Sequence, residues 1–186
     1  AVFPGLQGGP HDHQTAAIAV ALREALQPEF REYARQIVKN SKALAKSLSE
    51  EGIKLVSGGS ENHLILIDLT PFGKGKGLFA QEALEVAAIT TNKNTIPLDP
   101  SSPFYPSGLR LGTPAITTRG MKEREMGQVG KMIASCLKIA CVHEMPEEKE
   151  KREAAIAKAK AEIHKNPGLG KIRDEVLALC TKFPLH

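Results

Sequence analysis

Apolar and polar positions alternate at helical spacing over the first fifty residues. Residues 14–26 predict a helix that is apolar nearly all round at its start, which is typical of a helix buried against other protein. A second helix is predicted over 28–51, because Pro28-Glu29 suits a first helical turn, where a missing N–H is harmless and an acid faces the positive end of the dipole. Its apolar face holds Ile37, Leu44 and Leu48, and its predicted C-terminal cap is Gly52.

Strand-forming residues crowd together after this cap. Two neighbouring strands are predicted over 53–56 and 63–69, separated by a turn at 57–60. A glycine-rich loop over 73–77 leads to a short helix predicted over 80–88. A further strand is predicted to begin near Ile89, a proline-containing loop runs from Asn94 to Gly108, and Leu109-Arg110-Leu111 predicts the last strand.

Helical spacing returns in the last third of the chain. Thr117 or Thr118 is predicted to cap a helix that runs to about His143. A highly charged helix follows over 147–164, and an amphipathic one over 171–183. Helices, then strands, then helices indicate an α+β fold with a small, mainly antiparallel sheet, covered by helices on one face and preceded by a long N-terminal helical extension.

Composition narrows the classes of function. The formal charge of +4 comes from cations and anions that are interspersed along the helices, which favours a solvated surface over a nucleic-acid footprint. Aromatic residues make up 4% of the chain and Trp is missing, so the base-stacking platforms of single-strand binders are not expected. The longest apolar runs are far shorter than the roughly 20 residues of a membrane-spanning helix, so no membrane partner is expected.

Two further features concern the origin of the chain. It starts at Ala1 without an initiator Met or a targeting pattern, so we expect that it was cut from something longer. The three cysteines, Cys136, Cys141 and Cys180, occupy apolar helical positions without CxxC spacing. We interpret them as small buried hydrophobic residues of a protein in the reducing cytosol.

Candidate chemistry begins at the N-terminus. The glycine-rich run 3–10 precedes a helix, and open backbone N–H groups there suit a phosphate, although such a run more often forms only a turn. His11-Asp12-His13 resembles a metal site in composition. Adjacent ligands at a helix entry diverge, however, so capping and surface roles are favoured and no metal is expected.

Two later segments offer polar groups. The loop of Asn92 to Pro97 and Ser102-Pro103-Phe104 is of the kind that carries binding residues, or else a surface excursion stiffened by prolines. Arg110 stands inside an otherwise apolar strand, where a buried guanidinium would need an anionic partner. Its planar fork suits a substrate carboxylate, and an internal salt bridge explains it equally well.

Four segments together resemble serine hydroxymethyltransferases, in order and with compatible spacing. They are Gln7-Gly8-Gly9-Pro10, Gly58-Gly59-Ser60-Glu61-Asn62-His63-Leu64, Asn92-Lys93-Asn94 and Ser107-Gly108-Leu109-Arg110-Leu111-Gly112-Thr113-Pro114-Ala115. The resemblance runs to about Cys141 and returns over 171–184, and it corresponds to the C-terminal portion of that family. It implies a fold-type-I enzyme dependent on pyridoxal 5'-phosphate that moves a one-carbon unit between serine and tetrahydrofolate in the cytoplasm.

The resemblance also implies roles for single residues. Arg110 binds the substrate carboxylate, Gly8 and Gly9 contact the cofactor phosphate across a subunit interface, and Asn94 with Ser102, Pro103 and Phe104 contacts folate. Residues 1–35 would be the tail of the large cofactor-binding domain, with the phosphate loop and a connecting helix, and 36–186 the C-terminal domain. The implied partners are serine or glycine, tetrahydrofolate and further copies of the chain, in a homodimer or homotetramer.

The chain also departs from the family pattern. The family's Schiff-base lysine follows a Thr-Thr-His motif that does not occur here, so the implied catalytic set is empty and we expect the chain to be inactive alone. The charged stretch 145–166 is expected to be an insertion relative to compact bacterial members, with a solvated helix favoured over a partner site. The alternatives are another fold-type-I enzyme, such as an aminotransferase or a threonine-aldolase-like enzyme, or a stable non-catalytic domain.

Overall fold

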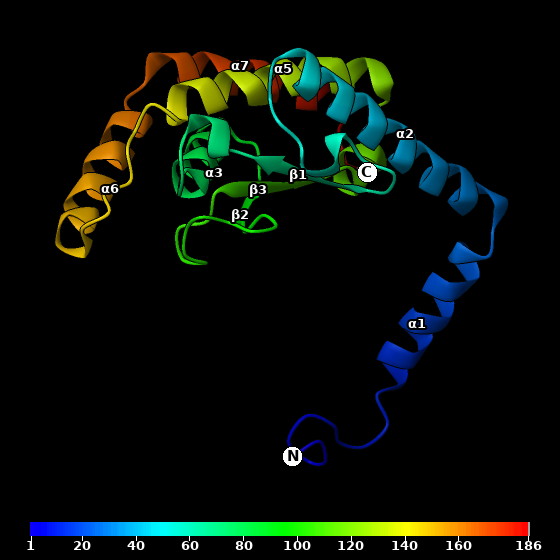
Figure 1. The fold of residues 1–186 in the computed structure, drawn as a ribbon. Coiled ribbons are helices and arrows are strands. Elements are labelled where there is room, and N and C mark those ends of the chain that lie inside the picture. Colours follow the sequence, from blue (N-terminus) through cyan, green and yellow to red (C-terminus); the bar gives the residue numbers. More distant parts are fainter. Residues whose placement is uncertain (186) are drawn as a thin grey trace. The chain divides into compact units, whose positions relative to one another are not determined.

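The protein is described here as a computed structural model that covers residues 1–185. The chain divides into two compact units, residues 1–35 and 36–186, which are described separately. The first unit contains helix α1, Asp12–Ala25, and the opening turns of α2, Pro28–Glu50. Figure 1 gives the order of the elements along the chain.

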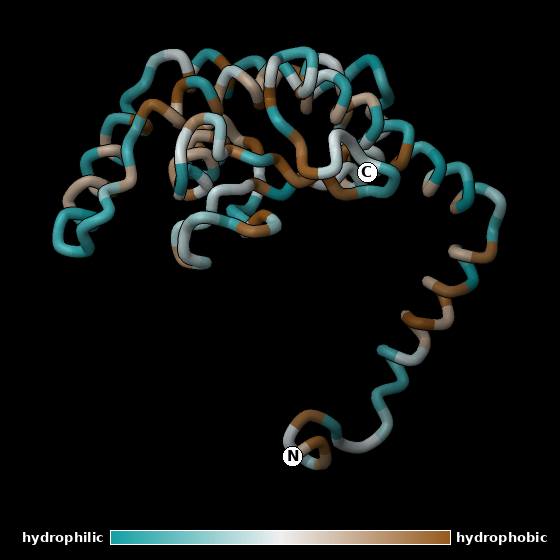
Figure 2. The backbone as a smooth tube through the Cα atoms, viewed as in Figure 1, coloured by the Kyte–Doolittle hydropathy of each residue, from teal (hydrophilic) through white to brown (hydrophobic). Residues whose placement is uncertain are grey.

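Helix α1 has no buried residue, so the prediction of a buried helix is wrong for the structure of this chain. Figure 2 shows apolar residues distributed along it, and Ile18, Val20 and Leu22 are 61%, 57% and 62% exposed. The apolar pattern correctly indicates a helix that suits burial. It does not say which surface would cover it, and the first unit contains no such surface.

Helix α2 closely follows its predicted span and ends as expected. Gly52 adopts a φ of 81°, and Ile53 N–H donates to Leu48 O at 3.0 Å. This is the hydrogen bond of a glycine-terminated helix, in which a left-handed residue lets the chain turn back over the last carbonyls. Its buried side chains belong to its second half and begin at Asn40.

A three-stranded antiparallel sheet is the centre of the second unit. Its strands are β1, Leu64–Asp68; β2, Asn92–Asn94; and β3, Gly108–Gly112, with β3 between the other two. The strand predicted over 53–56 is wrong. Leu55 makes a single bridge to Ile67, after which the chain enters a 3₁₀ turn at Val56–Gly58. Strand β2 begins three residues later than predicted.

Helices cover one face of this sheet, as predicted. Alternation along the strands buries Ile65, Ile67, Leu109 and Leu111 and leaves Leu64 and Arg110 exposed. Helix α3, Gly77–Val86, packs on β2 and β3, and three further helices pack against α3: α5, Glu123–Ala140; α6, Lys149–His164; and α7, Pro167–Lys182. Figure 1 shows α5 and α7 on the same side of the sheet. The α+β class is therefore confirmed.

The helix predicted from Thr117 to His143 is two helices. A short helix α4, Pro114–Thr118, ends before Gly120, whose φ of 88° turns the chain into α5. Thr117 is not a cap, because its buried hydroxyl donates to Thr113 O at 2.7 Å. The last helix also begins earlier than predicted, at Pro167.

Two cysteines behave as predicted. Cys136 and Cys141 are buried, and burial raises the pKa of both thiols to about 12, so both stay protonated near neutral pH. Cys180 is only half-buried. Across residues 1–185, no helix is both long and apolar enough to cross a bilayer.

Candidate functional site

Arg110 lies in the middle of β3, on the sheet face away from the helices. Its strand neighbours in register are Leu66 of β1 and Asn92 of β2. The guanidinium is exposed, and its Nε donates to Asn92 Oδ1 at 3.1 Å. The expectation of a buried guanidinium is wrong. Alternation along the strand sends Leu109 and Leu111 into the core and Arg110 outward.

The internal salt bridge that would explain Arg110 without a ligand is not found. Among residues 1–185, Arg110 takes part in no ion pair, and its side chain is hydrogen-bonded to the neutral amide of Asn92. The contact fixes the Nε edge of the fork. Both terminal nitrogens of the guanidinium remain available to bind an anion from outside the described chain.

A hollow lies beside Leu66 on the same face. Its volume is about 610 Å³, and residues 56–62, Leu64 and Leu66 line it. The loop keeps its shape through its own polar groups. Ser60 Oγ donates to Leu64 O at 2.6 Å, and Asn62 Oδ1 accepts from Leu64 N–H at 2.7 Å. One of the four motif segments therefore lines a cavity next to the strand position opposite Arg110.

The segment expected to contact folate is brought beside β2. Asn94 is half-buried at the end of β2, and its amide donates to Thr95 O at 2.6 Å. Ser102, Pro103 and Phe104 are exposed, Phe104 by 78%. Lys93 Nζ donates to Phe104 O at 3.0 Å and so joins β2 to this exposed turn.

Asp99 organises the loop between Asn94 and Gly108, and the sequence reasoning missed it. Its carboxylate accepts from the N–H groups of Ser101 at 2.9 Å, Ser107 at 2.9 Å and Ile96 at 3.2 Å. Burial alone would raise the pKa of this carboxyl, but these donors outweigh it and lower the pKa from its ordinary value of 3.8. The signal was available, because Asp-Pro-Ser is a turn-forming sequence in which the aspartate accepts from the residue two positions on.

Gly8 and Gly9 belong to the first unit, in the loop that leads into α1. Neither glycine has a hydrogen-bond partner among residues 1–185. A Cβ at Gly9 would meet nothing within 4 Å, and the nearest atom to one at Gly8 is His11 Nε2 at 4.0 Å. Open amides without side chains, close to the start of a 14-residue helix, fit a phosphate group.

The neighbouring histidines do not cap α1 through their side chains. His11 occupies the capping position, but its side chain makes no cap hydrogen bond, and its ring centroid lies 6.1 Å from that of His13. The side-chain capping role predicted for this segment is therefore wrong, whereas the predicted surface role is confirmed, because His11, Asp12 and His13 are all exposed. Nowhere in the described chain do three or more His, Cys, Asp or Glu side chains gather as a metal site would require.

Comparison with known proteins decides the family. A family profile for serine hydroxymethyltransferase matches residues 1–133. The chain belongs to the serine hydroxymethyltransferase family. It is 50% identical over its whole length to the serine hydroxymethyltransferase of Phenylobacterium zucineum (strain HLK1), and 47% identical over its whole length to that of Methanospirillum hungatei JF-1. It is 61% identical over 133 residues, 72% of the chain, to that of Acidothermus cellulolyticus.

The coverage of these relatives adds two facts. The chain spans 39%, 39% and 31% of the lengths of the three relatives, so it corresponds to part of each. Residues 145–166 fall inside the alignments with the Phenylobacterium and Methanospirillum proteins, which cover the whole chain.

Proposed function

We propose that this chain supplies part of the active site of a cytoplasmic, pyridoxal-phosphate-dependent serine hydroxymethyltransferase. The reaction transfers a one-carbon unit from serine to tetrahydrofolate and gives glycine and methylenetetrahydrofolate. The observation that carries the proposal is Arg110, an exposed guanidinium fixed on a sheet face by a neutral partner and paired with no acid of the described chain. Membership of the serine hydroxymethyltransferase family gives the reaction class.

Arg110 binds the carboxylate of serine or glycine in this proposal. Because Asn92 holds Nε, the fork presents its remaining N–H groups in a fixed plane, and a carboxylate accepts two of them in parallel. Two-point binding sets the orientation of the α-carbon, which is the atom whose bonds change in the reaction. Lysine offers a point charge without that plane.

Gly8 and Gly9 hold the cofactor phosphate through their amides, in another subunit of a homodimer or homotetramer. Pyridoxal phosphate, when bound, supplies the electron sink for bond cleavage at the substrate α-carbon. Asn94, Ser102, Pro103 and Phe104 contact tetrahydrofolate from the exposed turn beside β2. In the same proposal residues 1–35 are the tail of the large domain and 36–186 the C-terminal domain.

The test is Arg110→Lys in the full-length protein that carries this chain. Hydrogen bonds between charged groups contribute roughly 1.5–3 kcal/mol, so kcat/KM for serine should fall by roughly ten- to a hundredfold. Arg173→Lys, an exposed change on α7, is the matched control and should leave kcat/KM within about twofold. Equal kinetics for Arg110→Lys and the control would refute the assignment.

The chain by itself should lack activity, because it contains no lysine in the family's cofactor-anchoring motif. Purified residues 1–186 should cleave no serine when pyridoxal phosphate and tetrahydrofolate are supplied. Calorimetric titration with serine and with folate separates a partial site from a non-catalytic domain, since heat with either ligand supports the former. Serine cleavage by the isolated chain would contradict this part of the proposal.

A further inference from the structure

We propose that residues 145–152, which connect α5 to α6 and open α6, are a brace that positions the exposed turn Ser102-Pro103-Phe104, with Arg152 as the positioning residue. This inference rests on the proposed role of that turn in binding tetrahydrofolate. It gives a function to the charged segment that the sequence alone leaves unassigned. Contacts at both ends of the brace support this role.

Arg152 is fixed by the backbone of the brace itself. Its Nε donates to Pro146 O at 2.8 Å, and its Nη2 donates to Glu147 O at 2.6 Å. Its Cζ lies 5.5 Å from the centre of the Tyr105 ring. Two carbonyls hold the guanidinium, and a cation close to the ring centre is attracted by the negative face of the aromatic system. The brace therefore reaches the 95–107 loop through Tyr105.

Tyr105 directly follows the exposed turn and closes it. Its N–H donates to Ser102 O at 2.9 Å, so Ser102, Pro103 and Phe104 project from a turn whose far end is the residue that Arg152 contacts. Lys93 Nζ holds the Phe104 carbonyl at 3.0 Å from the β2 side. The three exposed residues thus stand between two cationic contacts.

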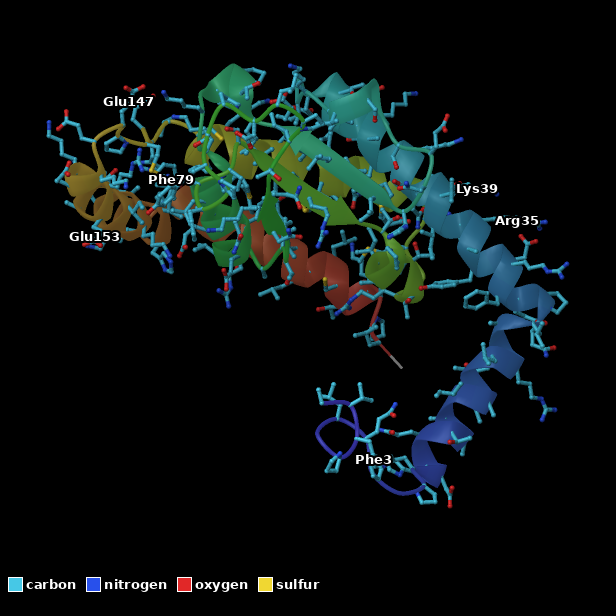
Figure 3. All side chains as sticks on the ribbon, turned by 60° about the horizontal axis from the view of Figure 1, so that its bottom comes forward. Phe3, Arg35, Lys39, Phe79, Glu147 and Glu153 are labelled. Atoms are coloured by element: carbon cyan, nitrogen blue, oxygen red, sulfur yellow. The ribbon has the colours of Figure 1, made fainter. Side chains whose placement is uncertain are left out.

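Gly75 lies where the brace, the turn and the glycine-rich loop meet. A Cβ at this position would lie 3.3 Å from Met145 Cγ, from Ser101 Oγ and from Tyr105 O. Gly75 also has a φ of 71°, a conformation that favours glycine. Lys74 forms an ion pair with Glu147, which Figure 3 shows on the connection that leads into α6. The three segments pack closely at this position.

The remainder of the connection is anchored to α3. Lys76, at the start of α3, is fully buried, and its Nζ donates to His143 O at 2.6 Å and lies 3.3 Å from Glu144 Oε1. Within α6, Lys160 and His164 lie 2.6 and 2.7 Å from the Glu82 carboxylate. A lysine buried with one carbonyl and one carboxylate as partners is costly to displace, so this contact resists movement of the brace.

A turn held at both ends loses less conformational entropy when a ligand binds it, and the brace should therefore act on folate affinity. It should have little effect on serine, because Arg110 belongs to β3 and takes its contact from Asn92. The expected signature is a change confined to the tetrahydrofolate KM. General damage to the fold would change both substrates.

The experiment is Arg152→Met in the full-length protein, which keeps much of the side chain's length and removes the donors and the charge. We expect the KM for tetrahydrofolate to rise about five- to tenfold while the KM for serine stays within about twofold. Tyr105→Leu should reproduce the effect, and the double variant should add little to either single one, because both remove the same contact. Lys151→Met is the matched control on the same helix, since the Lys151 side chain forms an ion pair with exposed Glu148.

Amide hydrogen exchange of Tyr105 in residues 1–186 separates this inference from the proposed function, because the measurement needs no folate. Faster exchange at Tyr105 in Arg152→Met than in Lys151→Met supports the brace. Equal exchange in the two variants overturns it, as does an unchanged tetrahydrofolate KM in an active full-length protein. A wild-type protein without folate-dependent turnover refutes the proposed function, while the exchange result still decides whether Arg152 holds the turn.

Discussion

Two glycines one turn apart on α5 have different surroundings, which leads to opposite predictions for the same substitution. A Cβ at Gly130 would lie 2.4 Å from Ser47 Oγ and 2.7 Å from Ser47 Cβ of α2, whereas one at Gly127 would meet nothing within 4 Å. Gly130→Ala should therefore lower the free energy of unfolding by about 1–3 kcal/mol through overpacking. Urea unfolding of residues 1–186 measures the change.

Gly127→Ala is the matched control for that prediction. Alanine is favoured over glycine within a helix by up to about 1 kcal/mol, so this variant should be neutral or more stable. A gain in stability for Gly130→Ala alone would contradict the close approach of α2 and α5.

Asp99 makes a prediction about pH. Its pKa is lower in the folded protein than its ordinary value of 3.8, so the folded state holds this proton less tightly than the unfolded chain does. The stability from Asp99 is therefore present above about pH 3.8 and is lost as pH falls through the folded-state pKa. Asp99→Asn should cost about 1–3 kcal/mol at pH 7, because hydrogen bonds to a charged acceptor are lost.

The difference between wild type and Asp99→Asn should shrink as the pH falls below the ordinary pKa of the carboxyl. Urea unfolding of both proteins across that range measures it. Burial would raise the pKa of Asp68, but the hydrogen bonds from Lys54 and Thr70 outweigh it and lower the pKa. The stability that Asp68 contributes is also lost in acid, but it is the same in wild type and Asp99→Asn and cancels in their difference. A constant difference at every pH would show that Asp99 acts through its shape alone.

Single residues show what local sequence can and cannot predict. The strand around Arg110 and the glycine cap at Gly52 follow from local rules, and the structure has both. The exposure of Arg110 could have been predicted from the alternation of Leu109, Arg110 and Leu111, because leucines that face the core place the arginine on the opposite face. For Asp99 the local bond to Ser101 was predictable from Asp-Pro-Ser, whereas its bond to Ser107 requires the loop to close.

At the scale of elements, Asn166 makes the clearest prediction. Its Oδ1 accepts from Gly168 N–H at 2.8 Å, ahead of Pro167 at the first position of α7. Asn166→Ala should cost about 1 kcal/mol of unfolding free energy, because a helix N–H loses its acceptor. Asn166→Asp keeps an acceptor at the positive helix end and should stay within about 0.5 kcal/mol of wild type. Equal losses in both variants would exclude capping.

Errors in the predicted elements have a common physical cause. The residues at 53–56 have strand propensity, yet they contribute only the Leu55 bridge to Ile67, because the chain enters the 3₁₀ turn at Val56–Gly58. The helix expected from Thr117 is interrupted at Gly120, whose φ of 88° ends the helical backbone. Propensity gives the local preference of a segment for strand or helix, whereas its contacts with other elements decide whether it adopts that structure. The α6 helix was predicted from charge and spacing, but its contacts with Glu82 and Tyr105 require the folded chain.

At the scale of the whole molecule, the core lies in the second unit. Every buried apolar residue of the described chain lies at or beyond Leu44, and α1 contributes none. The α+β class was predictable, because the strand patterns lie together between two runs of helical patterns. The exposure of α1 was not predictable, since an apolar helix has the same pattern whether or not its partner surface is present.

This distribution predicts the outcome of removing residues 1–27. The remaining protein starts at Pro28, a suitable first residue for α2, and keeps every buried residue. Its free energy of unfolding should stay within about 0.5 kcal/mol of that of 1–186, because no buried contact is lost. Self-association should decrease, since the removed segment carries exposed Ile18, Val20, Leu22 and Leu26. Urea unfolding and sedimentation velocity test the two effects separately. A loss of more than about 1 kcal/mol would mean that residues 1–27 stabilise the second unit. Unfolding is measured at concentrations where both proteins sediment as monomers, so that self-association cannot contribute to the difference.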